Sequence, residues 1–155
     1  MVAGFDKASP TAESVGALFS PSGTNVAAKW LQVALSSGST NAFAVALQNP
    51  EAVDVLILRC VLDITTAGGT ATSVLDVDVV SGATSTGDDI FDGVDANAAA
   101  ISDSLNGTDN GTNGEGKSWK WDAQGGTNDY VTAKILVANA ASLVGNLYIQ
   151  YVPTA

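Results

Sequence analysis

The stretch from Val53 to Ile64 is the strongest constraint on how this chain can fold. Charged residues occur in it only at Asp54, Arg59 and Asp63, and every even-numbered position from 56 to 64 is apolar. An alternation with a period of two indicates a β-strand. A strand that is apolar on both faces has to be covered on both faces. The second face therefore packs against another layer of the protein or against another subunit.

The odd-numbered side of this strand supplies candidate contact residues: Val53, Val55, Ile57 and Val61. If the even-numbered side points into the core, these four side chains are exposed to solvent on an isolated subunit. Burying a large aliphatic side chain contributes about 1.5–3 kcal/mol, so several of them together favour association. We expect the protein to self-associate through this face.

The rest of the chain from residue 26 shows the same strand character. Short apolar runs are separated by glycine, serine, threonine and asparagine, which predicts strands at 29–35, 42–47, 74–80, 117–121, 130–137 and 147–152. A turn or two of helix is considered within 94–105, around Ala98–Ile101. The pattern predicts an all-β fold, an antiparallel β-sandwich of jelly-roll or Greek-key type, in one domain over residues 26–155.

Residues 1–25 form a different kind of segment. Pro10, Pro21 and three glycines interrupt it, and its apolar residues follow no sustained period. Such a segment gains order by docking on a partner. We interpret it as an N-terminal arm whose candidate contact residues are Val2, Phe5, Leu18 and Phe19.

The composition argues against catalysis and against several partners. The chain has no histidine and one cysteine, Cys60, which falls in the apolar run and is expected to be a core residue. Without histidine, the usual general base and the commonest zinc ligand are missing. A net charge of −10 repels nucleic acid and anionic membranes, and no apolar run is long enough to span a bilayer. We expect no enzyme, no nucleic acid and no membrane partner.

Two clusters remain as candidates for binding. The acidic residues Asp88, Asp89, Asp92 and Asp95 offer oxygen ligands for a hard cation, but their loop lacks a complete ligand set. We expect a solvated loop, with no metal and no cofactor. Trp119 and Trp121 share one face of a strand, where they either stack on a sugar or fill the core or a subunit interface.

Several stretches carry a family resemblance, which covers about two-thirds of the chain. From Asn49 onwards their order resembles that of the small head-decoration, or cement, proteins of tailed bacteriophages and related archaeal viruses. The matching stretches are Asn49-Pro50-Glu51-Ala52-Val53-Asp54, Leu62-Asp63-Ile64-Thr65-Thr66, Leu75-Asp76-Val77, Ile90-Phe91-Asp92-Gly93-Val94-Asp95, Gly111-Thr112-Asn113-Gly114, Asp129-Tyr130-Val131-Thr132-Ala133 and Leu143-Val144-Gly145-Asn146-Leu147-Tyr148-Ile149.

The resemblance implies a virion structural protein without catalytic residues. It would be a jelly-roll subunit, commonly a homotrimer, that binds the major capsid protein on the outer surface of an icosahedral capsid and stabilises it. Assembly would take place in the host cytoplasm. The alternative is a receptor- or carbohydrate-binding sandwich of a virion fibre or adhesin, which would expose Trp119, Trp121 and Tyr130 around a groove.

Overall fold

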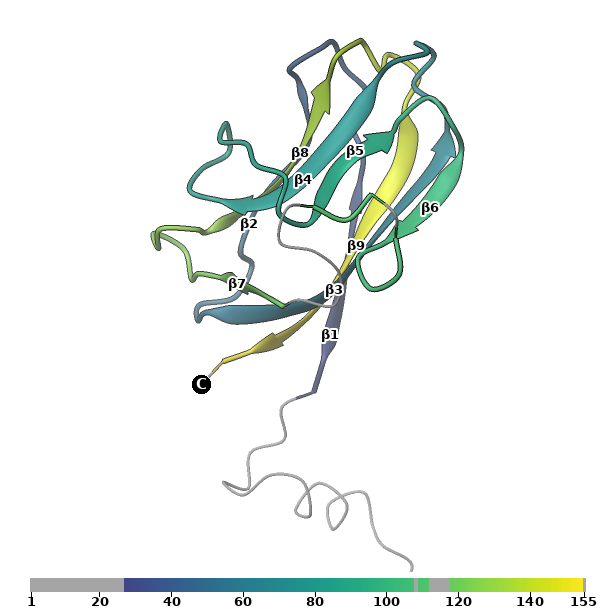
Figure 1. Cartoon of the computed structure of the whole chain (residues 1–155). Helices are drawn as coiled ribbons and strands as arrows, with labels where there is room; N and C mark the ends of the chain where they lie inside the picture. The colour runs from purple at the N-terminus through teal and green to yellow at the C-terminus, as the bar shows by residue number, and fades with distance from the viewer. Residues whose placement is uncertain (1–26, 108, 112–117, 155) are drawn as a thin grey trace, which may run out of the picture.

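The computed structural model describes residues 27–107, 109–111 and 118–154. These residues form nine strands and no helix (Figure 1). The strands are β1 Lys29–Ala34, β2 Phe43–Gln48, β3 Val55–Thr66, β4 Val74–Val80, β5 Phe91–Asp95, β6 Ala100–Asp103, β7 Trp119–Trp121, β8 Tyr130–Leu136 and β9 Val144–Pro153.

The strands pair into two antiparallel sheets that face each other. One sheet has the order β1-β9-β3-β6, with β7 also paired to β3, and the other has the order β2-β8-β4-β5. If the short β7 is left out and the other eight strands are renumbered in chain order, β8 becomes strand 7 and β9 becomes strand 8. The two sheets then have the strand orders 1-8-3-6 and 2-7-4-5. This is the strand order of a jelly roll. The predicted all-β sandwich is confirmed.

A β-bulge in β3 changes which of its residues point into the core. The pairing of β3 with β9 shifts between Ile57 and Arg59, and an extra residue in one strand reverses the faces beyond it. Before the bulge the fully buried residues are Val55 and Ile57, and after it they are Cys60 and Leu62. The expectation that Val55 and Ile57 lie on the solvent-exposed face of this strand is therefore wrong.

Residues 94–105 contain strand and turn in place of the helix considered for them. Val94 is buried on β5, which pairs with β4, and residues 100–103 pair with β3 as β6. Alanine favours helices by only about 0.5 kcal/mol over most other residues. Pairing to an exposed edge of β3 overrides so small a preference.

β6 and β7 pair with the same edge of β3, and between them the backbone of Cys60 has no strand partner. Ser104 supplies the missing hydrogen bonds. The hydroxyl oxygen of Ser104 accepts the N–H of Cys60 at 2.9 Å, and the N–H of Ser104 donates to the carbonyl of Cys60 at 3.0 Å. Both residues are buried. Because a buried backbone group without a partner is costly, this pair of bonds keeps the edge of β3 closed.

The core lies between the sheets and is largely aliphatic. Its largest fully buried side chains are Trp121, Phe91, Ile57, Leu62, Ile64, Leu75, Ile90, Ile135, Leu147 and Ile149. The indole N–H of Trp121 donates to the carbonyl of Asp129 at 2.9 Å, and its ring meets that of Tyr151 edge to face at 6.3 Å. Cys60 is buried in this core, as expected.

Candidate contact surface

The predicted contact residues fall into three groups. Val2, Phe5, Leu18 and Phe19 lie outside the described residues, as does the predicted arm of residues 1–25. Val55 and Ile57 belong to the core. On the surface, Val53 is 43% exposed just before β3, and Val61 is half-buried opposite Tyr148 of β9.

Val61 belongs to the outer face of the five-stranded sheet, which carries more apolar surface than the sequence indicated. Trp30 on β1 is 53% exposed, and Ile101 on β6 is 71% exposed. The half-buried Tyr148 lies between Val61 and Gln32 in the strand register. The exposure of Trp30 could be read from the sequence, since Leu31, Val33 and Leu35 share the opposite side of its strand.

β1 forms one edge of this sheet, and part of that edge has no partner. The N–H of Leu35 donates to Gly145 of β9. Because alternate residues direct their backbone groups to opposite edges, those of Trp30, Gln32 and Ala34 point away from β9. The next such group, the N–H of Ser36, is bound by the carbonyl of Ala44 at 2.8 Å. Within the described residues, the outward-facing backbone groups of Trp30, Gln32 and Ala34 have no backbone partner.

One end of the sandwich, which we call the arm end, is where β1 begins and β9 and the described chain end (Figure 1). Lys29 Nζ lies 2.6 Å from Glu51 Oε1, which also accepts the hydroxyl of Tyr151. Lys120 pairs with Asp54 and Asp122 at 2.8 and 2.7 Å. These cations lower the pKa values of Glu51, Asp54 and Asp122.

The side chain of the fully buried Asn49 hydrogen-bonds to three segments at the arm end. Its amide nitrogen donates to the carbonyls of Val53, Trp121 and Asp122, and its side-chain oxygen accepts the N–H of Glu51. One side chain therefore joins the end of β2, the start of β3 and the end of β7.

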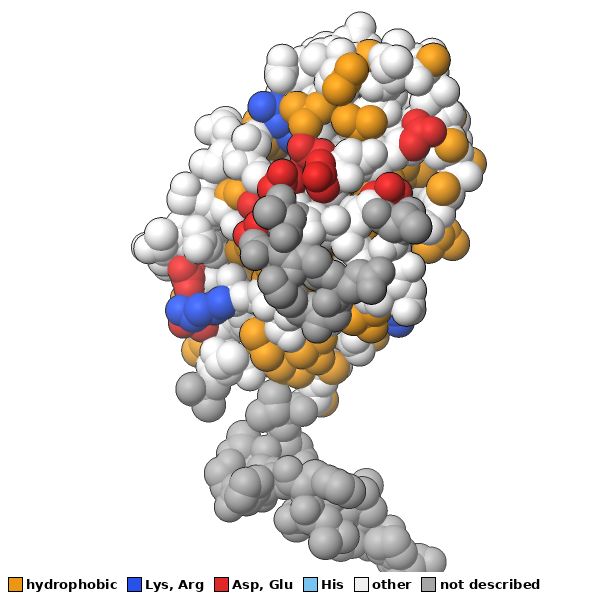
Figure 2. Space-filling view, in the orientation of Figure 1, with side chains coloured by type: hydrophobic (Ala, Val, Ile, Leu, Met, Phe, Trp, Pro, Cys, Tyr) orange, Lys and Arg blue, Asp and Glu red, His pale blue; other side chains and the backbone are white. Residues whose placement is uncertain are grey.

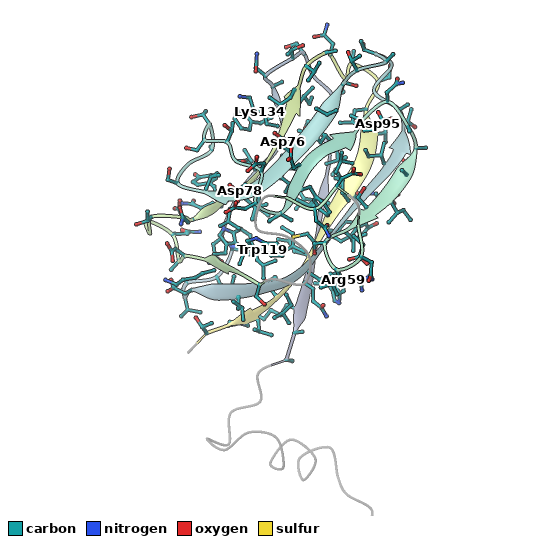
Figure 3. All side chains as sticks on the ribbon, in the orientation of Figure 1. Arg59, Asp76, Asp78, Asp95, Trp119 and Lys134 are labelled. Carbon is teal, nitrogen blue, oxygen red and sulfur yellow. The ribbon has the colours of Figure 1, made fainter. Side chains whose placement is uncertain are left out.

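Acidic residues gather instead around β4 and β5, and Figure 2 shows this group as a red area. Asp76 and Asp78 lie on the outer side of the four-stranded sheet, and Asp76 is in register with Lys134 (Figure 3). The loop between β4 and β5 covers part of this side, because the Thr132 hydroxyl donates to the carbonyl of Ser85 at 3.1 Å. Asp78 is consequently only 9% exposed.

The pKa of Asp78 is raised to about 6, chiefly by burial and also by the nearby Asp89 and Asp88 carboxylates. The backbone N–H groups of Val79 and Asp89 donate to the Asp78 carboxylate and act in the opposite direction. Burial also raises the pKa of Asp76. Asp78 is therefore a group that takes up a proton in mildly acidic solution.

A cavity and a buried cysteine are the chemical features to consider in the part of the chain that the structure describes. A cavity of about 300 Å³ is lined by Asp78, Val79, Asp89, Ser118, Trp119, Lys120 and Asn128. Burial raises the pKa of the Cys60 thiol, which keeps it protonated and unreactive. No three histidine, cysteine or acidic side chains in residues 27–107, 109–111 and 118–154 are placed to hold a metal ion.

The tryptophans of β7 do not form an exposed stacking surface. Trp119 is 8% exposed and Trp121 is fully buried, so the interpretation of both as core residues is confirmed. In the described residues, no helix is long and apolar enough to cross a membrane.

Comparison with solved structures matches the chain to a chain of the capsid of Ralstonia phage GP4. The TM-score is 0.51 with 17% sequence identity, over 84% of this chain and 85% of that chain. No protein-family model matches the sequence, and neither does any curated protein. At this level of identity the likeness shows a shared fold, and it agrees with the jelly-roll strand order.

Proposed function

We propose that this chain is a virion structural protein that decorates and stabilises the outside of an icosahedral capsid, without enzymatic activity. The observation that carries the proposal is the jelly roll, which the chain shares over most of its length with a chain of a phage capsid. Its partners are the major capsid protein and further copies of itself, most simply as a homotrimer.

The surface of the sandwich supports this role. Trp30 and Ile101 expose apolar area on a sheet face whose Arg59 is paired with Asp103, and exposed apolar area favours contact with other proteins. The acidic group around β4 and β5 lies elsewhere and repels copies of the same charge. A copy bound through the five-stranded sheet or the arm end keeps its acidic side in solvent.

The proposed attachment device is the N-terminal segment of residues 1–25. It leaves the described sandwich at the arm end, beside the start of β1. It carries Val2, Phe5, Leu18 and Phe19, whose apolar surface gains from burial against a partner. We infer that this arm lies on the capsid shell or clasps an adjacent subunit, while the sandwich projects outward from the virion.

The experiment compares full-length protein with a variant that lacks residues 1–25. Both are mixed with capsid shells stripped of the decoration protein, and binding is measured by co-sedimentation. The full-length protein should bind to saturation, and the truncated protein should stay in the supernatant while its thermal unfolding remains cooperative. Equal binding by both proteins would place the contact on the sandwich, and no binding by the full-length protein would refute the proposed function.

A further inference from the structure

The unpaired edge of β1 offers an acceptor for another strand. The backbone groups of Trp30, Gln32 and Ala34 face outward there, and no hydrogen bond within the described residues satisfies them. Edge strands of this kind pair readily with an added chain. The exposed ring of Trp30 projects from the same strand onto the outer face, where it can cover an apolar side chain of the added strand.

The residues nearest to β1 in the sequence are poor candidates for the added strand. If the chain reversed directly before β1 through residues 25–28, the stretch opposite β1 would be residues 19–24, Phe19-Ser20-Pro21-Ser22-Gly23-Thr24. Pro21 has no N–H to donate to a ladder, and Gly23 weakens a strand. A tight hairpin with its own β1 is therefore disfavoured.

A more suitable candidate for the added strand lies further from β1 in the sequence, between Pro10 and Pro21. Residues 11–20 contain one glycine, Gly16, but no proline, so every residue has an N–H to donate, and Val15, Ala17 and Phe19 alternate along them on one side. Fully extended, the eight residues 21–28 span about 26 Å. That span is long enough for residues 11–20 to contact a second copy of the chain.

We propose that residues 11–20 of one copy add as a further strand along the β1 edge of a neighbouring copy. The proposal deepens the proposed function and rests on it, since it names what the arm clasps within an assembly of decoration subunits. The residues before Pro10, including Val2 and Phe5, stay available for the shell. Each copy gives one arm and accepts one, which generates a closed ring when the rotation between copies closes.

The test measures amide hydrogen exchange of the full-length protein at two concentrations. Paired in this way, the N–H groups of Trp30, Gln32 and Ala34 should exchange at least about 100-fold more slowly than in an open strand. The protection should disappear when the protein is diluted until it dissociates. Val33, whose backbone faces β9, is the internal control and should stay protected throughout. Protection that survives dilution would mean that each arm pairs with its own β1, and unprotected amides at all concentrations would mean that the edge stays free; either result overturns the proposal.

Matched variants separate backbone pairing from side-chain effects. Gln32→Pro removes an outward N–H without breaking a bond to β9, and Gln32→Ala keeps that N–H while removing the same side chain and its bond to Asn146. Gln32→Pro should abolish self-association in light scattering, and Gln32→Ala should keep it. Ala17→Pro against Ala17→Ser repeats the comparison on the arm, outside the sandwich. Leu18→Pro is tested beside Ala17→Pro, because the N–H of only one of these two neighbours faces β1. If both proteins still self-associate while Gln32→Pro does not, the edges pair directly with each other and the proposal fails.

Shell binding distinguishes failure of this inference from failure of the proposed function. If the full-length protein co-sediments with shells but its β1 amides stay unprotected at every concentration, the decorating role stands and the strand exchange does not. If it does not bind shells at all, the proposed function fails, whatever the exchange of the β1 amides shows.

Discussion

Asp78 should make the protein less stable at neutral pH than at mildly acidic pH. Its carboxylate lies under the loop between β4 and β5, where a Cβ atom added at Gly87 would lie only 1.8 Å from Oδ2. Asp88 and Asp89 add repulsion. Because the folded state raises the pKa of Asp78 above the value in the unfolded chain, the protonated form favours folding. This contribution is present below about pH 4 and is lost as the pH rises through about 6.

The size of the effect follows from the shift. A change from 3.8 to about 6, at about 1.4 kcal/mol per unit, corresponds to about 3 kcal/mol in the free energy of unfolding. Asp78→Asn removes the charge but loses an acceptor for one backbone N–H, which costs about 1 kcal/mol. At pH 7.5 the variant should therefore be about 2 kcal/mol more stable than the wild type, or about 4–8 °C higher in Tm.

The assay is urea unfolding at a series of pH values from 4.5 to 8. The stability of the wild type should fall over this range, and that of Asp78→Asn should fall less, by the part that the raised pKa of Asp76 still contributes. Asp122→Asn is the control of opposite sign, since Lys120 lowers the pKa of Asp122. That variant should be less stable than the wild type at every pH in this series, because the contribution of Asp122 is lost only as the pH falls below the ordinary carboxyl pKa of 3.8 and through its lowered pKa. Parallel profiles for the wild type and Asp78→Asn would refute the reasoning.

Three further predictions concern the sandwich itself. Gly145→Ala should destabilise the protein by about 1–3 kcal/mol in urea, because the new Cβ would lie 2.1 Å from the carbonyl oxygen of Asp63; Gly82→Ala, whose Cβ meets nothing nearer than 3.6 Å, should be close to neutral. The Cys60 thiol should not react with a disulfide reagent in the folded protein and should react fully in urea; fast reaction in buffer would show that the core opens there. Added EDTA should leave the Tm within about 2 °C, and a larger fall that calcium restores would reveal a cation site.

The period of two along the chain was enough to predict the fold class. Most strands recur close to their predicted positions, because alternating residues such as Leu75 and Val77 have one buried side in any sandwich. The strands at 91–95 and 100–103 were missed, since they are short and carry residues such as Gly93 and Ala100 with little strand preference. Only pairing to β4 and β3 makes them strands.

The candidate contact surface was predicted less well, for a definite reason. One bulge near Leu58 exchanges the faces of β3, and no local pattern marks its position in a stretch that is apolar on both sides. Val55 and Ile57 therefore moved from the expected contact face into the core, while Trp30 and Ile101 became the exposed residues. The burial of Asp78 depends on the loop of residues 81–90, which directly follows β4 and shows no strand period, so the strand pattern alone could not show it.

The antiparallel pairing of β1 with β9 has a practical consequence for carrying foreign peptides. Lys29 lies opposite Tyr151, so a passenger joined at the C-terminal end of β9 emerges at the arm end, beside the start of β1. Residues 69–72 join β3 to β4 at the opposite end of the sandwich and are exposed. A passenger inserted there would be presented away from the arm, with both of its ends held by the two sheets.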